Sequence, residues 1–331
     1  MKRLRQFARL LVGAQLLPAL ESGDEVLVGG QAVLEGVMMR SPHAYAIAVR
    51  KPSGKIAIHR EHLERLSEKH RWAGWPLLRG LATLGQAMAL GFRALRYSAN
   101  VALEETAETG EAAQGKKLEI SGGLMALNVI FSLGFFIFLY KFVPLVATAQ
   151  LEKLNPWFGG AIAFNLVDGA IRIALFLTFI WAVSLWDDIR RVYRYHGAEH
   201  KTVFAFESRE PVTIQSAQAW PTFHPRCGTS FLMTVMLISI VFYTLVPAIT
   251  FWGRFGIRIA LLPLIAGVSY EIIRFAAKNR GSLFALLTQP GLWLQRITTQ
   301  PPSDDMVECA ILALDQAMDL EKERGGELVI A

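Results

Sequence analysis

The stretch that decides the fold is LMALNVIFSLGFFIFLYKFVPLVA, residues 124–147. It is an almost unbroken apolar run, long enough to cross the ~30 Å hydrocarbon layer of a membrane as an α-helix. Similar runs follow at residues 164–186, 229–252 and 256–277. The pattern predicts a mainly α-helical, multi-pass membrane protein with about four transmembrane helices.

The composition of the whole chain agrees with this interpretation. Of the 331 residues, 53% are hydrophobic and only 19% are charged, which is more apolar than a soluble protein of this length usually is. The net charge of +6 favours contact with the anionic face of a lipid bilayer. Nucleic acid is not an expected partner, because no aromatic–basic motif occurs. Cys227 and Cys309 lie far apart, which indicates no disulfide framework.

The distribution of basic residues predicts the orientation. The segment between the second and third apolar runs is rich in them, whereas residues 149–163 hold only Lys153. By the positive-inside rule, both termini and the 187–228 loop are expected on the cytoplasmic side of a bacterial inner (plasma) membrane.

The rest of the chain divides by composition. Residues 1–23 predict a basic amphipathic segment on the membrane surface, with a signal peptide as the alternative. Residues 24–75 predict a small cytoplasmic α/β unit, because alternating stretches at 45–49 and 55–59 flank the turn sequence KPSG and indicate a β-hairpin. An interfacial helix and linker (76–120), the transmembrane domain (121–280) and an interfacial and cytoplasmic C-terminal segment (281–331) complete the division. Within the last segment, residues 304–324 predict a soluble helix with Val307, Ile311, Leu314 and Met318 on one face.

The first chemical motif follows the second apolar run, on a helix that we expect to continue from it. His196, Glu199 and His200 spell H-x-x-E-H. Two imidazoles four residues apart share one helix face and can bind one divalent metal, for which zinc is well suited. A Glu beside the second His can accept a proton from metal-bound water, as in the inverted zinc-protease motif. The alternative is a polar helix end with surface histidines.

Two further elements could complete such a site. His224 and Cys227 lie three apart in a Pro- and Gly-bounded turn, which either supplies metal ligands or caps the next helix. Glu271 lies inside the fourth run, where a carboxylate is costly and either functional or paired with Arg274. The predicted topology places all these residues in one leaflet. We therefore predict metal binding by His196, His200 and either Glu271 or the His224/Cys227 pair, with catalytic Glu199.

Other polar residues have simpler interpretations. Asp168 and Arg172, four apart in the second run, are expected to neutralise each other. The segment GGQAVLEGVMMRSP at 29–42 contains no phosphate-loop or dinucleotide fingerprint. It is interpreted as a turn and a buried segment, with a pocket framed by Glu35 and Arg40 as the alternative.

Five segments together resemble the YqhQ-like family of bacterial membrane proteins, a domain of unknown function labelled a predicted metal-dependent enzyme. They are GGQAVLEGVMMRSP (29–42), AIAVRKPSGKI (46–56), YHGAEHKTVFAFE (195–207), HPRCGTSFL (224–232) and PGLWLQRITTQPP (290–302). The resemblance implies an integral membrane protein. Its label of metal dependence rests on the same His, Glu and Cys residues and implies no substrate.

Three functions remain open from the sequence. The first is a cytoplasm-facing zinc hydrolase acting on a peptide or a lipid-linked ester, with Arg226 or Lys201 as a candidate oxyanion donor. The second is a non-enzymatic membrane scaffold or assembly factor, in which His196, His200, His224 and Cys227 would close a structural metal shell or form a polar network. The third is a transporter, which four spans with few charges favour least unless the chain forms a homo-oligomer.

Overall fold

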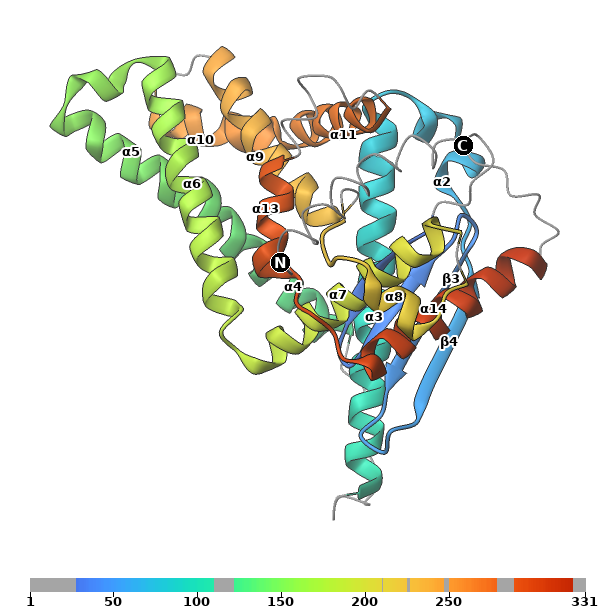
Figure 1. Cartoon of the computed structure of the whole chain (residues 1–331). Helices are drawn as coiled ribbons and strands as arrows, with labels where there is room; N and C mark the ends of the chain where they lie inside the picture. Colours follow the sequence, from blue (N-terminus) through green and yellow to red (C-terminus); the bar gives the residue numbers. More distant parts are fainter. Residues whose placement is uncertain are drawn as a thin grey trace.

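The computed structural model describes residues 28–109, 122–209, 211–224, 227–246, 250–278 and 289–323. The amphipathic segment predicted at residues 1–23 lies outside this part of the chain. The described residues form a small α/β unit beside a bundle of apolar helices (Figure 1). The predicted mainly helical class is confirmed, and the strands belong to a single sheet.

The sheet is a four-stranded antiparallel meander with the order β1-β2-β3-β4. Its strands are β1 (Gly29–Val33), β2 (Gly36–Arg40), β3 (Ala44–Arg50) and β4 (Ile56–His62). The predicted hairpin is β3–β4, in which Arg50 pairs with Ile56 across the KPSG turn. The expected β-hairpin is therefore confirmed as part of a larger sheet, of which the sequence did not predict β2.

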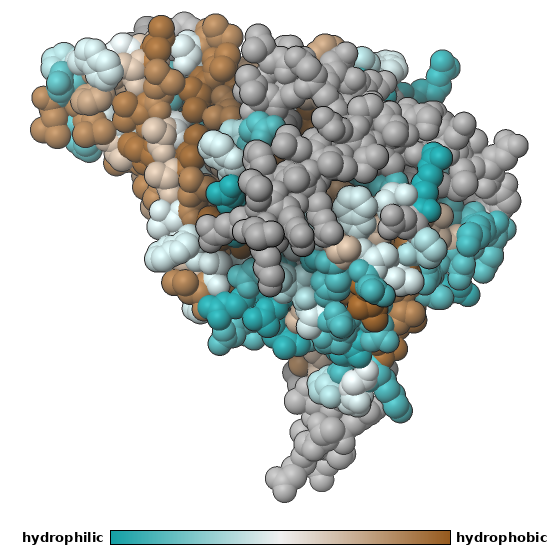
Figure 2. All heavy atoms as spheres, viewed as in Figure 1, coloured by the Kyte–Doolittle hydropathy of each residue, from teal (hydrophilic) through white to brown (hydrophobic). Residues whose placement is uncertain are grey.

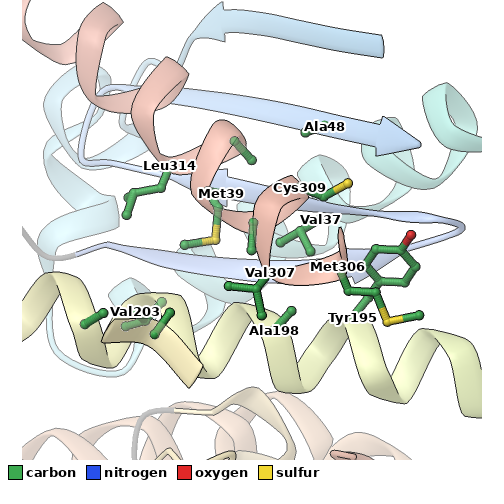
Figure 3. Close-up of a cluster of buried hydrophobic side chains, with 14 of the residues drawn as sticks. Val37, Met39, Ala48, Tyr195, Ala198, Val203, Met306, Val307, Cys309 and Leu314 are labelled. Carbon is green, nitrogen blue, oxygen red and sulfur yellow. The ribbon is translucent and has the colours of Figure 1, made fainter. Parts of the chain in front are cut away.

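Helices cover both faces of the sheet. On one face, Val37 and Met39 pack with Ala198 of α7 (Asp187–Glu207) and Leu314 of α14 (Asp304–Glu323) (Figure 3). On the other face, Met38 packs with residues of α3 (Leu78–Thr109). A strand that is buried on both sides loses the apolar–polar alternation of a half-exposed strand. β2 (GVMMR) has large apolar residues at successive positions and was not recognised, whereas β3, which is equally buried, was recognised because its large residues alternate with alanines.

Shorter elements connect these layers. They are α2 (Leu66–Lys69), η2 (Arg71–Gly74), α8 (Ile214–Ala219) and α13 (Gln289–Thr298). The helix predicted at 304–324 is confirmed as α14, whose Val307, Leu314 and Met318 are buried on the expected face.

The apolar bundle contains three helical stretches that are long and apolar enough to cross a membrane, at Ile130–Leu154, Ala161–Val183 and Gly228–Leu245. A fourth candidate is a helix pair bent by 48° at Leu261. The bundle elements are α4 (Gly122–Ile137), the π-helical turn η3 (Phe138–Phe142), α5 (Val143–Leu154), η4 (Pro156–Gly159), α6 (Ala161–Val183), α9 (Gly228–Leu245), α10 (Phe251–Ala260) and α11 (Leu262–Lys278). The fourth predicted run, at 256–277, therefore covers most of a bent pair of helices.

The bundle has apolar residues outside and several charged residues inside. Phe131 and Leu245 are 75% and 71% exposed, whereas Asp168, Arg172 and Arg258 are at most 2% exposed. Figure 2 shows a continuous apolar surface over the region of α5 and α6, and a polar surface lower in the view. A fold that is stabilised in water normally has the opposite distribution.

The second candidate span, α6, does not continue into the motif helix α7, which corrects that expectation. The chain turns after Val183, and Trp186 is extended at the start of α7. Tyr195, Ala198 and Val203 on one side of α7 are buried in the core against the sheet. This apolar side can be buried only if α7 leaves the direction of α6, as Figure 1 shows.

Candidate metal centre

Helix α7 packs into the core with one side and carries the two motif histidines on another. Tyr195, Ala198 and Val203 pack into the core between α7, the sheet and α14. His196 and His200, one turn apart, lie together with their ring centroids separated by 4.4 Å. The helix predicted for this motif is confirmed, with both imidazoles on one side as the spacing requires.

Cys227 joins the two histidines to form a three-residue group. One ligand atom each of His196, His200 and Cys227 lie within 4.8 Å of one another, the only such group of metal-ligating side chains found in the described part of the chain. Cys227 Sγ is 3.3 Å from His196 Nε2. Cys227 is also the N-cap residue of α9, so the start of that helix fixes the sulfur beside α7.

Backbone carbonyls orient both imidazoles. His196 Nδ1 donates to Thr298 O at 2.8 Å, and His200 Nδ1 donates to Thr222 O at 2.5 Å. Because a carbonyl oxygen only accepts, the proton of each neutral ring belongs on Nδ1 and the lone pair on Nε2. Metal-binding histidines are typically held in this way by their second ring nitrogen.

A glycine allows one of these contacts. A Cβ at Gly197 would lie 2.1 Å from Gln300 O, so only glycine lets the 298–300 segment approach α7 this closely. Gln300 N also donates to Tyr193 O at 3.0 Å. The hydrogen bond from His196 Nδ1 to Thr298 O therefore depends on residue 197 being a glycine, which has no side chain.

Glu199 lies at the edge of the group. Its Oε2 is 3.6 Å from His200 Nε2 and 3.8 Å from His196 Nε2. The side chain is buried against β1, where it accepts the backbone N–H of Gly30. Burial raises the pKa of Glu199, and burial lowers the pKa of His200 to about 4, which keeps this imidazole neutral at pH 7. Neutral imidazole is the form that binds metal.

His224 lies beside the group but points elsewhere. Its Nε2 is 3.4 Å from Glu207 Oε2, and its ring packs edge-on against Phe204. Gln295 holds its backbone at both ends, accepting from His224 N at 2.7 Å and donating to His224 O at 2.8 Å. Burial lowers the pKa of His224 to about 4. Of the predicted His224/Cys227 pair, the structure brings Cys227 to the two motif histidines.

Glu271 is held by a different part of the chain. Arg79 Nε donates to Glu271 Oε1 at 2.7 Å, Arg79 also pairs with Oε2, and Leu77 N donates to Oε1 at 3.2 Å. Both carboxylate oxygens are thus bound by the beginning of α3 and the residue before it, and Glu271 is not part of the three-residue group. Arg79, rather than the expected Arg274, is the partner that hydrogen-bonds the carboxylate.

Of the two candidate oxyanion donors, Lys201 has a described position. Lys201 Nζ donates to Gln218 O at 2.8 Å and to Trp220 O at 2.6 Å, so it holds the 218–222 segment over α7. Arg226 lies outside the described residues.

Several residues that build the site were not singled out from the sequence. Gly30 supports Glu199, Gln295 holds His224, and the carbonyls of Thr222 and Thr298 orient the histidines. Gly30 and the 295–298 segment lie in stretches that carry the family resemblance, and that resemblance was the signal by which they could have been found. A backbone carbonyl leaves no signal in the residue type, so Thr222 could not have been found.

A family model described as "protein of unknown function (DUF1385)" matches residues 75–320. The chain belongs to this family. The uncharacterized protein YqhQ of Bacillus subtilis (strain 168) is 35% identical over 304 residues, covering 88% of this chain and 92% of that protein. The resemblance inferred from the motifs is confirmed. No solved structure matches the chain. The DUF1385 match includes the three-residue group and the candidate spans, but not the sheet.

Proposed function

We propose that the chain is an integral protein of the bacterial inner membrane, with α7 and the sheet on the cytoplasmic side. The bundle has apolar residues on its surface and charged residues inside, and this distribution supports the proposal. Exposed Phe131 and buried Arg258 are favourable together only when lipid surrounds the bundle. Many basic residues lie between Asp187 and Cys227, whereas residues 149–163 hold only Lys153, and this difference supports the orientation.

We propose further that His196, His200 and Cys227 bind a divalent metal, most suitably zinc. The observation that carries this proposal is the convergence of the three ligand atoms within 4.8 Å, with both Nδ1 atoms already bonded to carbonyls. Two imidazoles and a thiolate suit zinc, and three protein ligands are the number typical of catalytic zinc sites. Bound zinc would act as a Lewis acid and would lower the pKa of a coordinated water.

The reaction that this arrangement supports best is hydrolysis. Glu199 Oε2 lies within 4 Å of both Nε2 atoms and can accept a proton from a water held beside them. The N–H of Gly30 fixes the carboxylate in this position. A peptide or a lipid-linked ester at the membrane surface is the expected substrate class. Glu199 is the general base, and His196 and His200 are ligands.

Metal content tests the site directly. Purified full-length protein, stripped with a chelator and re-exposed to zinc, should retain about one zinc per chain by elemental mass spectrometry. His200→Ala should lose it, whereas His62→Ala, which removes an exposed histidine of β4, should not. In cobalt-loaded protein, Cys227→Ser should remove the thiolate-to-cobalt absorption band. Equal zinc content in wild type and His200→Ala would contradict the proposal.

The Glu199→Gln variant tests whether Glu199 acts as the general base or as a metal ligand. The variant should keep the zinc content of the wild type, because the amide replaces a carboxylate that is not one of the three ligands. Its hydrolysis of fluorogenic ester and peptide panels should fall by about a hundredfold or more. Parallel loss of metal would contradict the role of general base.

A structural centre in a non-enzymatic membrane scaffold or assembly factor is the second candidate. This candidate is favoured because the three-residue group connects three helices. His196 of α7 contacts Cys227 at the start of α9 and Thr298 at the end of α13. In that case His200→Ala should lower the thermal stability of the metal-loaded protein, and Glu199→Gln should leave its cellular function intact.

A further inference from the structure

A second group of charged residues lies inside the apolar bundle. Arg172 of α6 and Arg258 of α10 both contact Asp168, the latter at 3.4 Å between Arg258 Nη2 and Asp168 Oδ2. Lys141 of η3 adds a third cation, and its Nζ donates to Tyr243 OH at 3.0 Å. We call Lys141, Arg172, Arg258 and Asp168 the bundle charge cluster. The expected Asp168–Arg172 pair is present, but it is part of this larger group.

The charges of the cluster do not balance. Arginine stays protonated in proteins, so two guanidinium groups share the single carboxylate of Asp168 even before Lys141 is considered. Arg172 and Arg258 are each 2% exposed, and Asp168 is fully buried. Burying an unpaired charge costs several kcal/mol, and more so between helices in an apolar bundle.

Aromatic rings provide only part of the compensation. The guanidinium carbons of Arg172 and Arg258 lie 5.2 Å and 5.3 Å from the centroid of the Tyr243 ring. A cation–π contact stabilises a buried cation less than a buried counter-ion does.

Unused hydrogen-bond donors point to the missing group. Arg258 Nε and Nη1 and Arg172 Nε are buried and have no hydrogen-bond partner among the described residues. Asp168 Oδ1 is an acceptor without a partner in the same part of the chain. If one arginine turned to donate to Asp168 Oδ1, that oxygen would gain a partner. Other N–H donors of the two arginines would still have none among the described residues.

The cluster lies toward the end of the bundle that is remote from the metal ligands. Asp168 is about two turns from the first residue of α6, and Tyr243 is two residues before the end of α9. The histidine group, by contrast, adjoins the opposite ends of these helices, where α6 leads into α7 and α9 begins. Arg172, however, is at the middle of α6, so an anion bound by the bundle charge cluster would lie between the middle of the bundle and this end.

We propose that Lys141, Arg172 and Arg258 bind a phosphate group, supplied either by an anionic lipid headgroup or by a soluble phosphate compound. Guanidinium N–H groups bind the oxygens of phosphate, and two arginines of the cluster have buried N–H donors that no described residue uses. A phosphate also supplies the negative charge that the cluster lacks. Lys141 acts as a point charge beside it.

Full-length protein in nanodiscs tests this assignment. Native mass spectrometry would count phosphatidylglycerol retained against phosphatidylcholine, and calorimetry would measure binding of inorganic phosphate in phosphatidylcholine discs. Lys141→Gln and Arg258→Gln should each weaken retention by about tenfold or more. Arg190→Gln, which removes a partly exposed cation paired with Asp187 outside the cluster, should match the wild type.

The outcomes distinguish the two sources. Selective retention of phosphatidylglycerol without phosphate binding identifies a lipid site, whereas saturable phosphate binding without lipid selectivity identifies a soluble ligand. Equal binding by wild type and a folded cluster variant, or no phosphate binding of either kind, overturns the proposal. If Arg258→Gln aggregates, Lys141→Gln decides, because Lys141 takes no part in the Asp168 ion pairs.

Discussion

At the scale of single residues, Gly30 and Glu199 show how closely the sheet supports the site. A Cβ at Gly30 would lie 2.6 Å from Glu199 Cγ and 2.7 Å from Met38 O. The strand can therefore carry no side chain at this position while Glu199 keeps its place. The H-x-x-E-H spacing predicted the relation of His196, Glu199 and His200 because one helix turn fixes it, but the spacing held no information about β1.

Gly30→Ala should destabilise the protein by about 1–3 kcal/mol, because the added methyl forces Glu199 or the backbone of β2 to move. The measurement is thermal unfolding of detergent-solubilised protein. Gly29→Ala is the matched control, since nothing lies within 4 Å of a Cβ there. The same melting temperature for both variants would show that Gly30 does not support the site.

At the scale of elements, the end of α14 is fixed to the β2–β3 turn by one carboxylate. Glu321 accepts from Ser41 Oγ at 2.6 Å and from His43 N at 2.8 Å, and its Oε1 is 2.7 Å from His43 Nδ1. Burial alone would raise the pKa of Glu321, but these hydrogen bonds outweigh it and leave the pKa below its usual value. Folding therefore favours the ionised form.

A carboxyl group whose pKa is lower in the folded state than in the unfolded state stabilises the fold at pH values above its unfolded-state pKa. This stabilisation is lost as the pH falls through its folded-state pKa. Glu321→Gln should thus lower the melting temperature at pH 7, and its difference from wild type should shrink below about pH 4. Glu323→Gln, at the partly exposed end of the same helix, should change little. A difference that grows on acidification would contradict this account.

Two other elements show where sequence patterns stop being informative. Strands β2 and β3 are both buried on both faces, but only β3 alternates large residues with alanines, and β2 has large apolar residues at successive positions. The break between α6 and α7 has no proline to signal it. It arises because the apolar face of α7 packs on the sheet, which is a tertiary contact.

At the scale of the whole molecule, the proposed orientation follows from the charges at the two ends of α6. Lys153 is the only basic residue in 149–163, before and at the start of α6, whereas the segment after α6 carries Arg190, Arg191 and Arg194. Alkaline phosphatase, which is active only after export, should be active when fused at Asn155 and inactive when fused at Asp187. A green fluorescent protein reporter should give the reverse pattern. Activity at Asp187 alone would invert the proposed orientation.

The sequence by itself determined the apolar helices, the α7 motif and the α14 face, because each depends on spacing within one segment. Only the tertiary structure decided which distant residues complete each site. It placed Cys227 with the histidines, paired Glu271 with Arg79, and put Arg258 beside Asp168. Such partners are chosen by how helices and strands pack, and packing brings together segments whose separation along the chain carries no signal.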